Sequence, residues 1–176
     1  MYDRSVLILG GARSGKSRLA QELAEKSNLP FAYLATGVVT DEEMEERVSR
    51  HRQQRPACWT TFEVRGSLRG VTATFPPGVL LDCVTFLVST HLLQGGGEEE
   101  VLGRVRDELD WLFLKRERER FFLIVVSNEV GQGVVPEHPL GRVFRDVQGR
   151  INQWIAGRCD EVVFVVAGLP WILKSF

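Results

Sequence analysis

The chain has 176 residues, of which 44% are hydrophobic, and it carries 22 basic against 23 acidic side chains. This length and apolar content predict one domain over residues 1–176, with a core of its own. The near-zero net charge argues against nucleic acid or an anionic membrane as the partner, so we expect a small-molecule substrate. The three cysteines lack metal or disulfide spacing, and no apolar stretch is long enough to cross a bilayer, so we expect a cytoplasmic protein without a membrane span.

Short apolar runs predict five strands, and several of the segments between them have helical patterns. The predicted strands cover residues 6–9, 31–35, 79–81, 121–126 and 162–166. Their nearly continuous apolarity indicates that both faces are covered. Helices are predicted over residues 16–27, from a capping box formed by Thr40 and Glu43, and over residues 98–120. Alternation of strands and helices predicts an α/β fold with a mostly parallel sheet.

The helical segment 98–120 has a regular apolar stripe. Val101, Val105, Leu109 and Leu112 recur at the spacing of one helix face, and that face should pack on the core. The charged residues around the rest of the segment are interpreted as a solvated face rather than a binding surface.

Residues 10–17 read GGARSGKS and directly follow the first predicted strand. This matches the phosphate-loop pattern G-x-x-x-x-G-K-[ST], in which backbone N–H groups and a helix N-terminus surround phosphate groups. Lys16 would reach the β- and γ-phosphates, and the Ser17 hydroxyl would ligate Mg²⁺. The alternative is a glycine turn that binds nothing. The predicted nucleotide-binding residues of this loop are Gly10, Gly11, Ala12, Arg13, Ser14, Gly15, Lys16 and Ser17.

Two carboxylates follow predicted strands, where open α/β sheets place their ligand loops. Asp82 ends a buried strand and has the position of a second Mg²⁺ ligand, or it caps the following turn. Glu129 follows the fourth predicted strand and either contacts the substrate or the nucleotide, or has a structural capping role.

His51 lies among arginines near the end of the second predicted helix. In one interpretation it has no chemical role and is a favourable cation at a helix C-terminus or a surface residue. In the other it is a nucleophile, kept neutral by the surrounding guanidinium groups. The residues alone leave both interpretations open. His91 and His138 have no accompanying constellation and are treated as ordinary.

Several motifs occur together, in order, along most of the chain. They are GGARSGKS at 10–17, Ala35-Thr36, Asp41-Glu42-Glu43-Met44, Arg47, His51, Arg55-Pro56, Trp59, Leu81-Asp82-Cys83-Val84-Thr85, Asn128-Glu129-Val130-Gly131 and Arg150-Ile151-Asn152-Gln153. In this combination the sequence resembles the bifunctional adenosylcobinamide kinase and adenosylcobinamide-phosphate guanylyltransferase family of cobalamin biosynthesis.

The resemblance implies two reactions. Adenosylcobinamide, a corrinoid, is phosphorylated from ATP or GTP, and GMP is then transferred from GTP to that phosphate through a guanylylated histidine, which matches His51. It also implies Mg²⁺, a RecA-type P-loop fold and a homo-oligomer, typically a trimer. Beyond the phosphate loop, the implied nucleotide-binding residues are Ala35, Thr36, Gly37, Arg52, Gln53, Gln54, Arg55, Glu63 and Asp82.

Two other interpretations of the motifs are a P-loop kinase of another small-molecule alcohol, with a structural His51, and a non-enzymatic GTP-binding module. The guanine-reading N-K-x-D element of GTPase switches is missing from the sequence; its nearest counterpart is the Asn-Glu-Val-Gly segment at 128–131.

Overall fold

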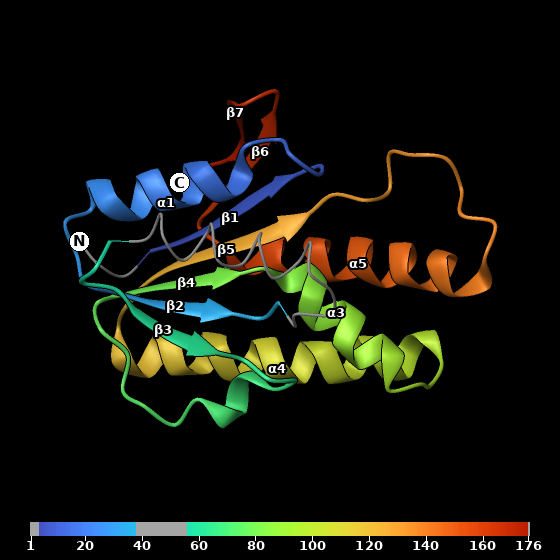
Figure 1. Ribbon diagram of the computed structural model, residues 1–176, viewed down its shortest axis with the longest axis horizontal. Helices are drawn as coiled ribbons and strands as arrows, with labels where there is room; N and C mark the ends of the chain where they lie inside the picture. The colour runs from blue at the N-terminus through green and yellow to red at the C-terminus, as the bar shows by residue number, and fades with distance from the viewer. Residues whose placement is uncertain (1–3, 38–55, 176) are drawn as a thin grey trace.

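The computed structural model describes residues 4–37 and 56–175, which form a seven-stranded sheet with helices on both faces (Figure 1). The strands are β1 (Ser5–Gly10), β2 (Phe31–Ala35), β3 (Thr60–Glu63), β4 (Gly78–Asp82), β5 (Phe122–Asn128), β6 (Glu161–Val166) and β7 (Leu169–Lys174). The helices are α1 (Lys16–Lys26), α3 (Val84–Leu93), α4 (Glu98–Glu119) and α5 (Pro139–Arg158), together with the 3₁₀ turn η1 (Leu68–Gly70).

The sheet has the strand order β3-β2-β4-β5-β1-β6-β7. Within the described ranges its strands pair in parallel, except that β7 runs antiparallel to β6. The carboxyl ends of the parallel strands therefore meet at one edge of the sheet, where α/β proteins bind ligands. One strand, β5, lies between β1, which carries the glycine-rich loop, and β4, which ends in Asp82.

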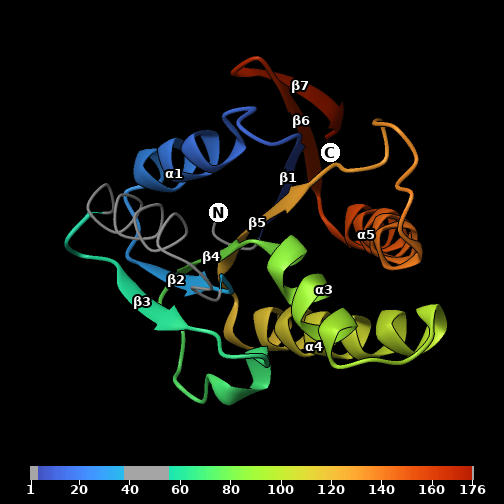
Figure 2. The ribbon, with the colours of Figure 1, turned by 45° about the vertical axis from the view of Figure 1, so that its right-hand side comes forward.

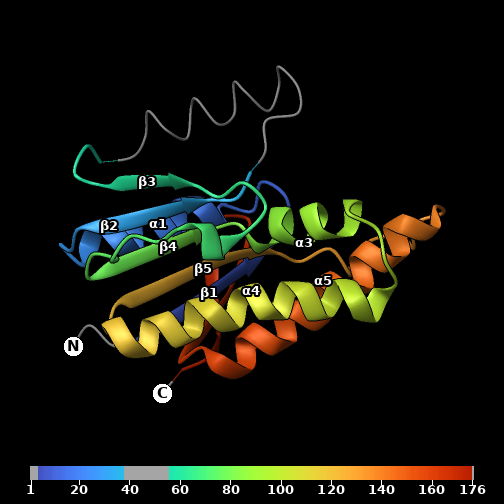
Figure 3. The ribbon, with the colours of Figure 1, turned by 90° about the horizontal axis from the view of Figure 1, so that it is seen from below.

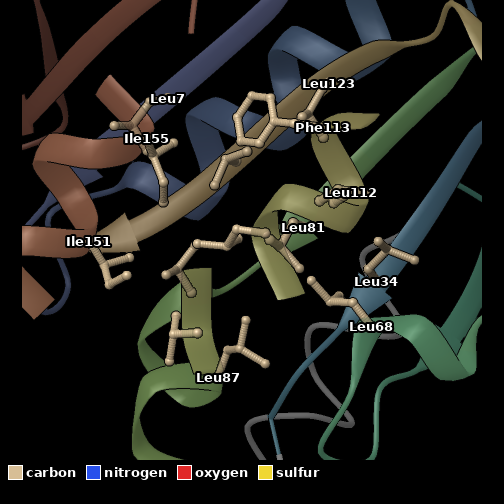
Figure 4. Packing of buried hydrophobic residues seen from close by; sticks show 14 of the residues in the cluster. Leu7, Leu34, Leu68, Leu81, Leu87, Leu112, Phe113, Leu123, Ile151 and Ile155 are labelled. Atoms are coloured by element: carbon tan, nitrogen blue, oxygen red, sulfur yellow. The ribbon is translucent and has the colours of Figure 1, made fainter. Parts of the chain in front are cut away.

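Figure 2 shows α1 on one face of the sheet and α3, α4 and α5 on the other. Ala20 and Ala24 of α1 are buried against one face, and their small side chains let the helix approach the strands closely. The larger core lies on the opposite face, where leucines of β1, β2 and β4 pack against the apolar stripes of α4 and α5 (Figure 4). α4 and α5 lie side by side below the sheet (Figure 3).

The prediction of a mostly parallel α/β fold is confirmed, and all five predicted strands are present. The predicted helices at 16–27 and 98–120 correspond to α1 and α4, and the four residues of the predicted α4 stripe are fully buried. The helix expected from Thr40 lies outside the described residues. β3, β7, α3 and α5 were not predicted.

The interpretation of the charged residues of α4 as a solvated face was wrong for Glu108. This side chain is buried, and its carboxylate accepts hydrogen bonds from the Ser67 hydroxyl (2.9 Å) and from the backbone N–H of Leu68 (2.7 Å). It thereby holds the start of η1 against α4. The helices of the described residues include none that is long and apolar enough to span a membrane.

Candidate functional site

The glycine-rich loop connects β1 to α1 in the way that the sequence predicts. Gly15 has a φ of +98°, a conformation that side chains disfavour, and it occupies the position just before α1 begins. At Gly10 a Cβ atom would lie 2.4 Å from the Ser14 Oγ and 2.7 Å from the Val165 carbonyl oxygen. Glycine is therefore required at both positions by the path of the backbone.

Lys16 and Ser17 form the start of α1, whose N-terminal dipole end faces the loop. The Lys16 side chain is largely buried, and its ammonium group donates to the Gly11 carbonyl oxygen at 3.3 Å. The buried hydroxyl of Ser14 has no hydrogen-bond partner among residues 4–37 and 56–175. The loop thus combines the Lys16 cation, the Ser14 hydroxyl and backbone N–H groups, which is the composition of an anion-binding site.

Neighbouring elements hold both ends of this loop. The Glu129 N–H, just beyond β5, donates to the Gly10 carbonyl oxygen at 3.1 Å, and the Gly168 N–H, in the β6–β7 turn, donates to the Ser14 carbonyl oxygen at 2.8 Å. The shape of the loop therefore depends on segments more than a hundred residues away in the sequence.

Asp82 lies at the carboxyl end of β4, and its carboxylate accepts a hydrogen bond from the hydroxyl of Tyr33 on β2. The residue before α3 is Cys83, which makes no side-chain cap bond. The Asp82 carboxylate is thus oriented from a neighbouring strand, an arrangement better suited to a ligand site than to a helix cap. Tyr33 was not predicted, because its contact with Asp82 crosses the sheet.

Thr36 is buried, and its N–H donates to the Asp82 carbonyl oxygen at 3.2 Å. Its Oγ1 donates to the Cys83 carbonyl oxygen (2.6 Å) and accepts from the Cys83 N–H (2.9 Å), so it fixes the backbone that follows Asp82. Burial, followed by the nearby Asp82 charge, raises the pKa of the Cys83 thiol to about 11. A direct nucleotide contact of Thr36 stays a prediction.

Ala35, Glu63 and Asp82 stand level with one another at the ends of β2, β3 and β4. The exposed Glu63 carboxylate lies 3.5 Å from the Arg65 guanidinium, and Gly37 follows two residues after Ala35. These residues share the sheet edge of the glycine-rich loop, although Glu63 is on the outermost strand. Their roles in nucleotide binding stay predictions.

Glu129 was predicted either to contact the substrate or the nucleotide, or to have a structural capping role. Its carboxylate accepts from the Gly131 N–H at 2.5 Å, so the second role is present. His138, treated as ordinary, accepts from the Leu140 N–H and caps α5. The candidate nucleophile His51 and the neighbouring Arg52, Gln53, Gln54 and Arg55 lie outside the described residues.

The family model described as cobinamide kinase / cobinamide phosphate guanyltransferase matches residues 6–173. The bifunctional adenosylcobalamin biosynthesis protein CobP of Pseudomonas aeruginosa strain PAO1 is 42% identical over 177 residues, which cover 96% of each chain. The bifunctional adenosylcobalamin biosynthesis proteins CobU of Salmonella typhimurium strain LT2 and Escherichia coli strain K12 are each 39% identical over 180 residues, covering 96% of this chain and 99% of theirs.

Solved structures similar to this chain support the fold. The flagellar accessory protein FlaH of Methanocaldococcus jannaschii superposes with a TM-score of 0.53 at 17% identity, covering 99% of this chain and 79% of that one. A protein of Pyrococcus horikoshii OT3 described as Project ID PH0250 superposes with a TM-score of 0.56 at 14% identity, covering 100% of this chain and 88% of the other. At these identities the likeness concerns architecture alone.

Proposed function

The chain belongs to the cobinamide kinase / cobinamide phosphate guanyltransferase family, and on that premise we propose how its residues carry out two reactions. The protein is a bifunctional enzyme of cobalamin biosynthesis, an adenosylcobinamide kinase and an adenosylcobinamide-phosphate guanylyltransferase. Its nucleotide substrates are ATP or GTP in the kinase step and GTP in the transferase step. The assignment of individual residues to these steps is our proposal.

The kinase step is assigned to the loop at residues 10–17. The observation that carries this assignment is the loop's geometry: Gly15 has a positive φ, Gly10 leaves no room for a Cβ atom, and Lys16 is held within the loop. The backbone N–H groups would bind the donor's phosphates, and Lys16 would stabilise the negative charge that develops on the transferred phosphoryl group. The Ser14 hydroxyl, which has no hydrogen-bond partner among the described residues, is available to the same phosphates.

Ser17 and Asp82 are proposed to hold Mg²⁺ together with the nucleotide phosphates. Both offer oxygen ligands, which Mg²⁺ prefers, and the Tyr33 hydroxyl fixes the orientation of the Asp82 carboxylate. The ion, when bound, would offset charge on the β- and γ-phosphates. The protein's part is to orient that carboxylate and the Ser17 hydroxyl at the carboxyl edge of the sheet.

The transferase step is proposed to pass through His51. A ring nitrogen would attack the α-phosphorus of GTP, forming a P–N bond while the bond to the β-phosphate oxygen breaks and pyrophosphate leaves. A phosphate oxygen of adenosylcobinamide phosphate would then attack the same phosphorus and free the histidine. Two displacements let pyrophosphate depart before the bulky corrinoid phosphate enters. Arg52 to Arg55 are proposed to bind the triphosphate beside His51.

We further propose a homo-oligomer, a trimer by resemblance to the family, in the cytoplasm. Association is supported by β7, an edge strand on which Leu169, Trp171, Ile172 and Leu173 are each more than half exposed. A reducing compartment is supported by the three cysteines, which are all free thiols.

The deciding experiment incubates the protein and its His51→Ala variant with Mg²⁺ and GTP labelled at the α-phosphate. We expect an acid-labile, base-stable label on the denatured wild-type protein and none on the variant, while the variant keeps its kinase turnover. A wild-type protein that binds GTP without becoming labelled would reject His51 as the nucleophile. It would also favour a mechanism in which GMP passes directly to the corrinoid phosphate.

A further inference from the structure

A small polar network is buried where α5 packs against the end of β5. Ser127 and Gln148 are fully buried and Asn152 nearly so. The Asn152 Oδ1 accepts from the Ser127 Oγ (2.7 Å) and from the Gln148 Nε2 (2.9 Å), and Gln148 also donates to the Ser127 Oγ (2.9 Å). Buried polar groups cost stability unless all are paired, and the Gln148 Oε1 has no partner in the described part of the chain. Apolar packing would serve the core better.

The network reaches one peptide group at the edge of the nucleotide site. The Asn152 Nδ2 donates to the Asn128 carbonyl oxygen at 3.0 Å. The N–H of the same peptide unit belongs to Glu129 and donates to the Gly10 carbonyl oxygen at 3.1 Å. A single planar peptide unit is therefore bonded at one end to α5 and at the other to the first residue of the phosphate loop.

A second bond limits the movement of this segment. The Asn128 N–H donates to the Oγ1 of Thr85 at 3.0 Å, and Thr85 lies in the first turn of α3, three residues after Asp82. The end of β5 is thereby bonded to the Gly10 carbonyl on one side of the proposed nucleotide site and to the Thr85 side chain on the other. Asn152 itself bonds to neither Gly10 nor Asp82 in the structure, so its effect must pass through the 128–129 peptide.

We propose that Asn152 is a positioning residue for nucleotide binding: its amide fixes the 128–129 peptide, which in turn fixes Gly10 and the start of the phosphate loop. The inference rests on the proposed phosphate site. Without the Asn152 donor the Asn128 carbonyl loses its buried partner, the peptide can rotate, and the Gly10 carbonyl loses the N–H that holds it. Small displacements of a phosphate-binding group are costly to catalysis.

Two variants separate positioning from general stability. Asn152→Asp keeps an acceptor for Ser127 and Gln148 but replaces the donor to Asn128. Ser127→Ala removes a hydroxyl at the same depth and leaves the donor in place. Hydrogen exchange followed by mass spectrometry is measured for both variants and for wild type, over the segments 6–17 and 128–131 and, as a core reference, over β2. Kinase KM for ATP and kcat are measured in parallel.

In Asn152→Asp we expect exchange at 128–131 and in the phosphate loop to rise about tenfold or more, while β2 changes no more than in Ser127→Ala. We also expect KM for ATP to rise and kcat to fall, together costing about tenfold or more in kcat/KM. Equal exchange patterns in the two variants, or wild-type protection in Asn152→Asp, would overturn the proposal. Asn152→Ala removes the donor without adding a carboxylate and carries the same test if the aspartate variant fails to fold.

Addition of Mg²⁺ and ATP to the wild-type protein separates this inference from the proposed function. Protection of residues 10–17 by the nucleotide is expected from the phosphate site itself. Its absence would count against that site. If the nucleotide protects the loop in wild type but exchange is identical in Asn152→Asp and Ser127→Ala, the role of Asn152 is overturned and the phosphate site is kept.

Discussion

Lys16 is the residue that we propose acts directly on the transferred phosphoryl group. Its ammonium group is held inside the loop by the Gly11 carbonyl, and a largely buried cation acts more strongly than an exposed one because water screens it less. We expect Lys16→Ala to lose more than about 2 kcal/mol of transition-state stabilisation in the kinase step. Lys26→Ala, at the exposed end of the same helix, should keep wild-type kcat/KM. Steady-state kinetics with ATP check both, and wild-type turnover in Lys16→Ala would reject the assignment.

Gly10 and Gly11 are adjacent in sequence but differ in the space around them. A Cβ at Gly10 would meet the Val165 carbonyl oxygen at 2.7 Å, whereas a Cβ at Gly11 would meet nothing within 4 Å. We therefore expect Gly10→Ala to destabilise the fold by about 1–3 kcal/mol, as overpacking does, and to weaken nucleotide binding. Gly11→Ala should remain near wild-type stability. Urea unfolding and ATP titration measure the two effects, and equal stability losses would contradict the contacts described.

Cys83 should make stability depend on pH in the alkaline range. Burial, and then the Asp82 charge, raises the pKa of its thiol from 9.0 to about 11 in the folded protein. Because the folded value lies above the unfolded one, this contribution is fully present below pH 9 and is lost as the pH rises through 11. We expect the unfolding free energy to fall over this window, by roughly 2–3 kcal/mol from this group.

Urea unfolding at pH 8 and pH 10.5 tests this for wild type and two cysteine variants. Cys83→Ala should show a shallower fall than wild type, since it lacks the thiol. Cys58→Ala removes an exposed thiol and should keep the wild-type slope. Identical slopes in all three proteins would show that Cys83 does not contribute.

At the scale of elements, the sequence predicts those strands and helices that have a clear local pattern of apolar residues. β1, β2, β4, β5 and β6 are continuous apolar runs, and α4 carries a stripe at helical spacing. β3 is a short strand of mostly exposed residues, and β7 contains Pro170 and is exposed on both faces, so both lack the alternation that identifies a strand. In α3 the buried residues have helical spacing, but Phe86 and Leu93 lie outside this stripe and His91 lies within it, which obscures the pattern. α5 contains three glycines, and the polar residues Gln148 and Asn152 lie on its buried face.

The same distinction applies to the site. The phosphate loop is a contiguous motif, and Asp82 is recognisable as the end of a strand, so both were predictable. Tyr33 contacts Asp82 from a neighbouring strand, 49 positions away, and Asn152 contacts Asn128 from a helix, 24 positions away. Both contacts depend on tertiary packing. Such contacts leave no local pattern, although polar residues at i and i+4 on a buried helix face are a usable signal.

The contact between α4 and η1 gives a prediction about stability alone. The Glu108 carboxylate accepts from the buried Leu68 N–H at 2.7 Å. Removing this carboxylate would leave the Leu68 N–H without that partner. We expect Glu108→Ala to cost about 1–3 kcal/mol of unfolding free energy and to leave kinase kcat/KM near wild type. Glu117→Ala, on the same helix, is the control for loss of charge. A loss of turnover with unchanged stability would contradict this structural role.

At the scale of the whole molecule, the two edges of the sheet differ in character. β3 presents mostly exposed polar side chains, whereas Leu169, Trp171, Ile172 and Leu173 of β7 are 72%, 66%, 58% and 52% exposed. The apolar edge is also held firmly: Lys174 donates to the Cys159 carbonyl oxygen at 2.6 Å, and Gly168 donates to Ser14 at the turn. An exposed apolar edge strand that is held in place tends to associate with other chains unless it is covered.

If copies of the chain cover β7 in the proposed trimer, a charged side chain introduced on this strand should dissociate the trimer. We expect Trp171→Lys to convert the oligomer to a monomer, because the interface would lose the indole contact and would have to bury an unpaired ammonium group. Leu93→Lys places the same charge at another exposed apolar position, at the end of α3, and should leave the mass unchanged. Light scattering coupled to size-exclusion chromatography measures the mass of all three proteins. A wild-type monomer, or a trimer that survives Trp171→Lys, would show that β7 is not the surface that holds the copies together.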